Sequence, residues 1–480
     1  MIHMPFITYK GQTSGPTLVL DIIYKEWRVE WGYIMFHYSM VKFVRGHSVK
    51  LDRPLRDAII SLYKPLRFVP CFLHGFIEKC IRSKKKLSVI IEFEPNPFFF
   101  NKMIVEHLFQ LNTKCAIKNE FAHIDCCSAL ITPDGLEMLI TQCSQVKKVY
   151  LNRMIKALDT GGAHQDINVH EPSSFFNTSK LTGKGVTIAI IDTGVYEHED
   201  LQGRLRAFVD FVNNRTRPYD DNGHGTHCAG NAAGNGHLSK GKYKSLAPEA
   251  DIIAIKVLDR TGTGTIERII QGLDWCIKFN QTHKENPIQI ISLSLGTHAM
   301  KYAHENEDPL VKMVEAAWRS GITVLIAAGN SGPERCTISS PGVSERAITV
   351  GALDDTIYPA ETADFSSRGP TIYGKPKPDI LVQGVDVISL RVPGSYIDRL
   401  EKKNRIDKHY SKMSGTSMST PICAGAVALL LHYNRTLSPD AVKKLLISGS
   451  VTTQANSNKL METGHLNIEQ SIHILKSFDV

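Results

Sequence analysis

The strongest constraint on the fold is an alternation of apolar strands and helical segments that begins after Gly183. Runs rich in β-branched residues occupy 186–191, 252–257, 288–295 and 323–328, and helical segments such as 266–279 and 311–319 lie between them. Apolar strands separated by helices are typical of a parallel sheet that is covered on both faces. The sequence therefore predicts an α/β fold. In such sheets, functional side chains collect at the carboxyl ends of the strands.

The N-terminal third has a different pattern. Residues 86–151 give the order strand, helix, strand, strand, helix, strand, which is the split βαβ or ferredoxin-like arrangement. We therefore divide the chain into four parts. They are a helix-leaning leader segment at 1–85, a small α+β domain at 86–153, a polar linker at 154–180 and the α/β domain at 181–480.

Charge and cysteine content narrow the function classes. The net charge is +8, and the whole basic excess lies in residues 1–160, which hold 22 Lys and Arg against 14 Asp and Glu. No nucleic-acid-binding module accompanies this charge, so a solvated basic face is expected and no nucleic acid partner. The ten cysteines form no disulfide framework, which favours free thiols. With no signal peptide and no apolar run of transmembrane length, we expect a cytoplasmic protein without membrane attachment, its release to the medium being left open.

An acidic residue ends the first apolar strand of the α/β domain. Asp192 follows the run 186–191 and precedes Thr193 and Gly194. An acid at this place is buried or half-buried and needs partners. Taken alone, it is compatible with a structural cap or with a nucleotide or metal ligand.

Two histidines stand close together in the segment 220–230. His224 and His227 are three residues apart, and Gly223 and Gly225 flank the first of them. Such a pair could bind zinc, but no third ligand lies at a suitable spacing. The flanking glycines allow backbone to approach His224 closely, which suits a catalytic imidazole at the start of a helix.

A serine and an asparagine complete the set of candidate residues. Ser417 precedes the apolar helix expected at 422–431, with Pro421 in its first turn, where backbone N–H groups and the helix dipole favour a developing oxyanion. Asn330 follows the strand 323–328 and offers an amide donor to the same oxyanion. Taken alone, Ser417 is equally compatible with a helix N-cap, and Asn330 with a turn residue.

The order of these motifs along the chain and the residues within them resemble those of a known family. The triad order Asp, His, Ser is that of subtilisin and differs from the orders in chymotrypsin and the α/β-hydrolases. The motifs are Asp192-Thr-Gly194, His224-Gly-Thr-His227, Asn330, and Gly415-Thr-Ser-Met-Ser-Thr-Pro421. Over roughly residues 181–470 the chain resembles the subtilases, the S8 family of serine proteases, and its closest likeness is to the AprX-like bacterial subtilases.

The resemblance implies a serine endopeptidase that hydrolyses peptide bonds through an acyl-enzyme. Ser417 would be the nucleophile, His224 the general base, Asp192 the carboxylate that orients the imidazole, and Asn330 the oxyanion donor. His227 would be structural. Protein or peptide substrates would be held in extended form by two edge strands, Gly262-Thr263-Gly264 and Ser294-Leu295-Gly296.

The resemblance also implies a zymogen. Residues 86–153 resemble the inhibitory propeptide of the family, which makes the chain's own propeptide an intramolecular inhibitor, and 154–180 would contain the self-processing site. No cofactor is expected to be required. Calcium binding is left open, because 235–246 lacks the Asn-rich ladder of the strong calcium site in secreted subtilisins. An insertion at 391–412 with seven Lys and Arg residues precedes Ser417 and is interpreted either as a shaper of substrate access or as a surface loop.

Two other function classes fit parts of the sequence. An inactive subtilase could serve as a binding or chaperone module, although a complete triad argues against it. A nucleotide-binding α/β protein would rest on Gly262-x-Gly264, which is too short a motif, and the chain has no P-loop.

Overall fold

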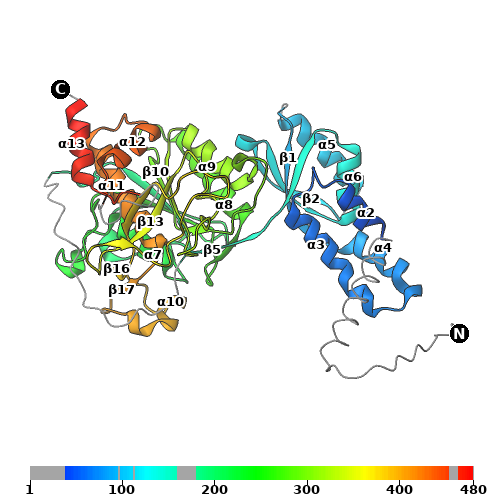
Figure 1. Cartoon of the computed structure of the whole chain (residues 1–480), viewed down its shortest axis with the longest axis horizontal. Coiled ribbons are helices and arrows are strands. Elements are labelled where there is room, and N and C mark those ends of the chain that lie inside the picture. The colour runs from blue at the N-terminus through cyan, green and yellow to red at the C-terminus, as the bar shows by residue number, and fades with distance from the viewer. Residues whose placement is uncertain (1–37, 96–97, 112–113, 159–179, 453–462, 479–480) are drawn as a thin grey trace, which may run out of the picture. The chain divides into compact units, whose positions relative to one another are not determined.

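The structure is a computed structural model that describes residues 38–95, 98–111, 114–158, 180–452 and 463–478 (Figure 1). The chain forms two compact units, which divide between Leu151 and Asn152 and are described separately. The first 37 residues of the predicted leader and residues 159–179 of the predicted linker lie outside the described residues.

A four-stranded antiparallel sheet forms the centre of the first unit. Its strands lie in the order β2-β3-β1-β4, with two helices in the connections. These elements are β1 Leu87–Phe93, α5 Phe98–Leu111, β2 Ala116–Phe121, β3 Cys126–Ile131, α6 Pro133–Gln142 and β4 Val146–Leu151. The order and the connections confirm the predicted ferredoxin-like arrangement.

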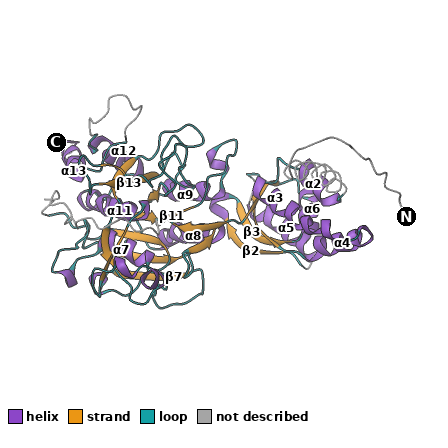
Figure 2. Cartoon of the chain, turned by 60° about the horizontal axis from the view of Figure 1, so that its bottom comes forward, coloured by secondary structure: helices purple, strands orange, loops and turns teal. Residues whose placement is uncertain are grey.

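Three further helices of the first unit share the core of this sheet. They are α2 Ser39–Gly46, α3 Arg53–Tyr63 and α4 His74–Lys84, with short 3₁₀ turns at Lys64–Phe68 and Cys71–Leu73. Side chains such as Val41, Leu55 and Ile59 are fully buried in one hydrophobic cluster with Val89 and Val149 of the sheet. Figure 2 shows these helices gathered on one side of the sheet. The helix-leaning segment and the sheet therefore form one packed body over residues 38–151.

The second unit is built on a largely parallel sheet of eight strands. Seven of them lie in the order β14-β13-β12-β10-β6-β8-β7, and β15 pairs with β13. The strands are β6 Thr187–Asp192, β7 Leu205–Asp210, β8 Asp251–Lys256, β10 Ile290–Leu293, β12 Thr323–Ala327, β13 Ile348–Asp354, β14 Glu361–Thr362 and β15 Ile380–Gln383. Only β14 is antiparallel to its neighbour. The predicted parallel sheet is confirmed, although the strand expected over 288–295 ends at Leu293.

Helices cover both faces of this sheet. They are α7 His224–Ala233, α8 Ile266–Thr282, α9 Pro309–Arg319, α11 Thr416–Tyr433, α12 Pro439–Gly449 and α13 Ile468–Phe478. Gly272 of α8 lies against Ile191, whereas Gly225 of α7 lies against the next residue of the same strand, Asp192. Because successive strand residues point to opposite faces, α7 and α8 lie on opposite sides of the sheet. Helix α11 packs with α7 on the face that carries Asp192.

Two small sheets complete the second unit. One has three short antiparallel strands in the order β11-β5-β9, namely β11 Leu295–Gly296, β5 Met154–Ala157 and β9 Thr263–Thr265. The other is a hairpin of β16 Val387–Leu390 and β17 Tyr410–Met413, which encloses the short helix α10 Tyr396–Leu400. No helix among the described residues is long and apolar enough to cross a membrane.

Candidate active site

Asp192 lies at the carboxyl end of β6, an inner strand of the sheet between β10 and β8. Its side chain is fully buried. The Oδ1 atom accepts hydrogen bonds from the backbone N–H of Thr193 at 2.7 Å and from the Nδ1 atom of His224 at 2.8 Å. The carboxylate therefore fixes the orientation of the imidazole and requires its proton on Nδ1.

His224 is the first residue of α7. The preceding residue, Gly223, has φ of 106°, a left-handed conformation that glycine adopts without strain. The backbone N–H of His224 donates to Oδ1 of Asn222 at 3.1 Å. Burial disfavours the charged imidazole, but the adjacent Asp192 carboxylate outweighs it and raises the pKa of His224 well above its usual value. The Nε2 atom makes no hydrogen bond to any residue in the described part of the chain, which leaves it available to a reacting hydroxyl.

His227, one turn along α7, has different partners. Its Nε2 atom donates to the carbonyl of Ser411 at 3.2 Å, and its Nδ1 atom accepts from the amide of Asn231 at 3.3 Å. Burial lowers the pKa of His227 to about 3, so the ring is neutral and joins α7 to β17. The cluster of described residues close enough to hold a metal consists of Asp192, His224 and Cys228 and does not include His227. The zinc interpretation of the histidine pair has no support in this geometry.

Ser417 lies in the first turn of α11, but the helix differs from the expectation. The helix begins at Thr416, so Pro421 lies in its second turn and not in its first. Pro421 has no N–H to donate to the carbonyl of Ser417 four residues earlier. That carbonyl instead accepts from the hydroxyl of Ser294 at 2.8 Å and from the thiol of Cys228 at 3.5 Å. The Ser417 hydroxyl donates to the carbonyl of Ser294 at 3.0 Å.

Asn330 follows β12 and is held in one orientation by Thr416. Its Oδ1 atom accepts from the backbone N–H and from the hydroxyl of Thr416, at 3.0 and 2.8 Å. The amide NH₂ therefore points the other way, and it donates to the carbonyl oxygen of Leu158 at 2.8 Å. Sequence reasoning missed Thr416. Its position directly before Ser417 was the available signal, but only the fold shows that it reaches Asn330.

A segment of this same unit occupies the groove between the two edge strands. Strand β5 pairs with β9 on one side, where Ile155 lies opposite Gly264 and Lys156 opposite Thr263. On the other side it pairs with β11, where Ala157 lies opposite Leu295 and Lys156 opposite Gly296. The remaining bonds are from Ala157 N–H to Gly262 O at 2.9 Å and from Leu158 N–H to Ser294 O at 3.3 Å. All six residues predicted to bind substrate thus contact one extended peptide.

The last described residue of this segment, Leu158, lies beside the candidate catalytic groups. Its backbone bonds to Ser294 and Asn330, and its side chain passes Gly296, where an added Cβ would stand 3.1 Å from its Cδ1 atom. Ile155, three residues earlier, is almost completely buried, whereas Met154 is about half exposed. The groove therefore holds an extended segment of this chain, and the side chains of Ile155 and Leu158 occupy apolar places in it.

Calcium is often bound by proteins with this fold, and the sequence left a calcium site open at the segment 235–246. Calcium takes six to eight oxygen ligands. The segment contains no acidic residue. The carboxylate of Asp200, which faces it, accepts from the Leu238 N–H at 2.9 Å and from the Tyr410 hydroxyl at 2.6 Å. Asn235 uses its side-chain oxygen for the N–H of His237. These residues do not form an oxygen cage for calcium.

Comparisons with known proteins agree with this geometry. Residues 183–465 match the model of the Subtilase family, Peptidase S8. The chain belongs to the subtilase family. It is 51% identical to serine protease AprX of Bacillus subtilis (strain 168) over 443 residues, which cover 91% of this chain and 99% of that protein. It is 34% identical to subtilisin Savinase of Lederbergia lenta over 60% of this chain and 91% of that protein. This subtilase is a subtilisin-like serine protease of enzyme class 3.4.21.

A solved structure shares the fold. The crystal structure of fervidolysin from Fervidobacterium pennivorans, a keratinolytic enzyme related to subtilisin, superposes with a TM-score of 0.62 at 17% identity. The match covers 81% of this chain and 61% of the fervidolysin chain. The subtilisin-type fold preceded by a small α+β region is therefore confirmed.

The expected cytoplasmic location is wrong. The relatives, serine protease AprX and the subtilisins, are secreted proteases, and nothing places this chain in the cytoplasm. The expectation rests on the absence of a recognisable signal peptide and on the unpaired cysteines, and neither of these determines the compartment of a protein. All ten cysteines are free thiols, and seven of them are buried.

Cys228 generates a prediction about chemical sensitivity. Its buried Sγ atom is 3.8 Å from Nδ1 of His224, and burial raises the pKa of the thiol. An organomercurial should inactivate the enzyme by displacing the imidazole, whereas iodoacetamide should react slowly because the thiolate is scarce. Residual activity after each reagent measures this. The Cys228→Ala variant should resist the mercurial. Unchanged sensitivity in that variant would show that Cys228 is not the thiol through which the mercurial acts.

Proposed function

We propose that this subtilase is an endopeptidase with Asp192, His224 and Ser417 as its catalytic triad, and that it is made as a self-processing zymogen. The observation that carries the proposal is the hydrogen bond from the Asn330 amide to the carbonyl oxygen of Leu158. A peptide carbonyl is thereby held by an oxyanion donor next to a serine hydroxyl, with the peptide aligned as a strand between β9 and β11.

In acylation, the Ser417 hydroxyl turns from the Ser294 carbonyl to Nε2 of His224, which takes its proton as Oγ attacks the carbonyl carbon. The oxyanion that forms is stabilised by the Asn330 amide and by backbone N–H groups at the start of α11. His224 then gives the proton to the leaving nitrogen, and the C–N bond breaks. Water attacks the resulting ester by the same route in reverse and regenerates the Ser417 hydroxyl.

Electrostatics support His224 as the base. The imidazolium that forms during attack is buried and would be costly without a counter-charge. The Asp192 carboxylate, 2.8 Å away, provides that charge, and in the neutral ring it holds the proton on Nδ1, so that Nε2 is the nitrogen that accepts the proton of Ser417. His227 is held neutral, and its ring bonds to the Ser411 carbonyl and the Asn231 amide, with no carboxylate among its described partners.

The zymogen part of the proposal follows from the identity of the bound segment. Residues 154–158 belong to this chain and fill the groove that a protein substrate would use, so the propeptide acts as an intramolecular inhibitor. The bonds from Leu158 to Ser294 and Asn330 support the bond after Leu158 as the scissile bond. We therefore assign self-cleavage to the Leu158–Asp159 bond, and assign residues 1–158 to the removed part. The proposed substrates are extended protein segments with an apolar residue before the cleaved bond.

The choice between the two histidines can be tested by labelling with a serine-directed fluorophosphonate. The wild-type enzyme should label, whereas Ser417→Ala and His224→Ala should not. His227→Gln should still label, because glutamine can replace the N–H bond to Ser411. Absence of label on the wild-type enzyme would instead favour an inactive subtilase that serves as a binding module.

Asn330 should contribute strongly to turnover. Asn330→Ala should lower kcat about 10²–10³-fold with little change in KM, a figure taken from the equivalent donor in subtilisin. Kinetics with a peptide amide substrate measure both constants. A variant with nearly full turnover would exclude Asn330 from the oxyanion site.

Self-processing predicts a defined mature N-terminus. The wild-type chain should begin at Asp159 by N-terminal sequencing, and Ser417→Ala should remain intact. Leu158→Asp should slow the cleavage at least tenfold, because a carboxylate would replace the apolar side chain beside Gly296. Met154→Asp, on an exposed position of the same strand, is the matched control and should be processed normally. A wild-type N-terminus elsewhere in 159–180 would contradict the assigned bond.

A further inference from the structure

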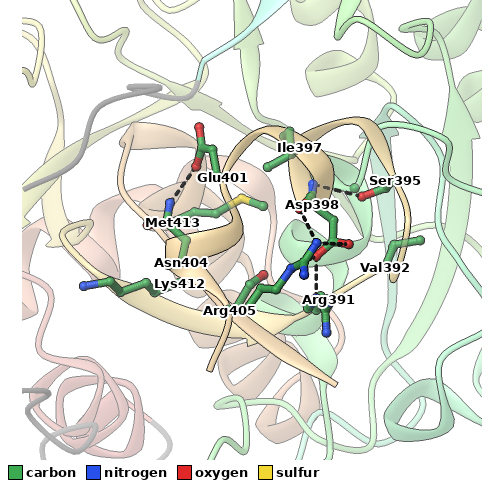
Figure 3. A pocket seen from close by; sticks show the side chains of 12 residues that line it. Arg391, Val392, Ser395, Ile397, Asp398, Glu401, Asn404, Arg405, Lys412 and Met413 are labelled. Carbon is green, nitrogen blue, oxygen red and sulfur yellow. Dashed lines mark hydrogen bonds and ion pairs between the residues drawn. The ribbon is translucent and has the colours of Figure 1, made fainter. Parts of the chain in front are cut away.

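The insertion at 391–412 is an ordered structure. It leaves β16, forms α10 and a 3₁₀ turn at Lys402–Asn404, and returns through β17. The two ends are joined by the hairpin and by a hydrogen bond from the Arg391 N–H to the His409 carbonyl at 2.8 Å. Figure 3 shows Asp398 beside the side chains of Arg391 and Arg405, with Ser395 bonded to its backbone. An unstructured surface loop would not have this arrangement.

Asp398 holds the insertion together. Its carboxylate accepts from Nε of Arg391 at 2.5 Å, from Nε of Arg405 at 2.8 Å and from the Gly394 N–H at 2.8 Å. Burial opposes the charge, but these donors outweigh it and lower the pKa of Asp398 to about 2. The side chain is only 4% exposed, so the bridge lies mostly out of solvent. The carboxylate therefore remains charged and fixes α10 at all pH values at which such an enzyme works.

The first turn of α10 is bonded to the loop that leads into α7. The backbone N–H groups of Tyr396 and Ile397 donate to the carbonyls of Asp221 and Asn222, both at 3.0 Å. These are first-turn N–H groups, which have no acceptor within their own helix. The residue before them, Ser395, is the N-cap, and its side chain accepts from the Asp398 N–H.

The loop to which α10 is bonded fixes the position of the His224 backbone at the start of α7. Asn222 accepts the His224 N–H with its Oδ1 atom and donates to the Arg260 carbonyl with its Nδ2 atom. Between them, Gly223 passes so close to the insertion that an added Cβ would stand 2.7 Å from the Ser395 hydroxyl. A shift of α10 would therefore move the backbone from which the imidazole projects.

We propose that the insertion is a positioning element for His224, in which Asp398 acts through the N–H groups of Tyr396 and Ile397. This inference rests on the proposed triad. Among the described residues, the groups that bond to segment 154–158 in the groove belong to Gly262, Thr263, Ser294, Leu295, Gly296, Asn330 and their strand neighbours, and none lies in the insertion. Loss of the contact should therefore affect turnover and leave substrate binding nearly unchanged.

The sharpest test removes one N–H. Tyr396 is the first residue of α10, where proline is well tolerated, and Ser395 has the extended conformation (φ −64°, ψ 173°) that a following proline requires. Tyr396→Pro therefore deletes the bond to Asp221 with the helix retained. Tyr396→Ala is the matched variant, because it also loses the ring but keeps the N–H. Asp398→Asn removes the charge that holds both arginines, and Lys403→Ala on the exposed surface is the neutral control.

Mature enzyme produced from the full chain is compared by kcat and KM on a peptide amide, by the rate constant of fluorophosphonate inactivation, and by thermal unfolding. We expect Tyr396→Pro to lower kcat and the inactivation rate constant about tenfold relative to Tyr396→Ala, with KM within twofold and the unfolding temperature unchanged. Asp398→Asn should lower the same two constants, and Lys403→Ala neither. The inactivation reaction needs Ser417 and His224 but no bound peptide, so its fall separates positioning from substrate recognition.

Equal inactivation rate constants for Tyr396→Pro and Tyr396→Ala would overturn the inference, and so would a change confined to KM. Ser417→Ala distinguishes this failure from a failure of the proposed function. If Ser417→Ala is inactive while Tyr396→Pro matches Tyr396→Ala, the triad stands and only the positioning role is wrong. If Ser417→Ala retains activity, the proposed function itself is wrong.

Discussion

The site depends on one backbone carbonyl, that of Ser417. In a regular helix it would accept an N–H from the residue four positions later, but that residue is Pro421. A buried carbonyl without a donor is costly, and here the donors come from two other elements. The Ser294 hydroxyl binds it from the start of the substrate groove, and the Cys228 thiol binds it from α7. The proline thus joins helix α11, which carries the proposed nucleophile, both to helix α7 and to the residue between β10 and β11.

Hydrogen bonds to buried polar groups also orient Asn330, the proposed oxyanion donor. An asparagine amide can be turned by 180° at little cost unless its surroundings distinguish oxygen from nitrogen. Thr416 makes that distinction, because both of its donors bind Oδ1 of Asn330. The NH₂ group is then directed at the carbonyl of Leu158 before any charge develops. Such preorganised donors stabilise an oxyanion without reorganisation during the reaction.

Much of this could be predicted from sequence, for identifiable reasons. The parallel sheet could be predicted from runs of β-branched residues. Asp192, His224 and Ser417 were proposed from motifs of a few adjacent residues at the ends of strands and helices. Thr416, Leu158 and the true role of Pro421 could not be predicted in the same way. Each of them acts through a partner that is distant in sequence: Thr416 and Asn330 are 86 residues apart, and Leu158 and Asn330 are 172. Only the fold reveals such pairs.

From sequence alone, the insertion at 391–412 could be either a shaper of substrate access or a surface loop, because its partners are also distant in sequence. Its contacts connect it to the sheet. Asp221 gives its carbonyl to Tyr396 and its carboxylate to the buried ammonium of Lys256, at 2.7 Å. That ammonium also binds the carbonyls of Thr193 and Leu258, at 2.6 and 2.9 Å. Thr193 directly follows Asp192. A continuous series of polar contacts therefore runs from α10 to the end of β6, which carries Asp192. The insertion is thus connected to both residues, to His224 through Asn222 and to Asp192 through Asp221, Lys256 and Thr193.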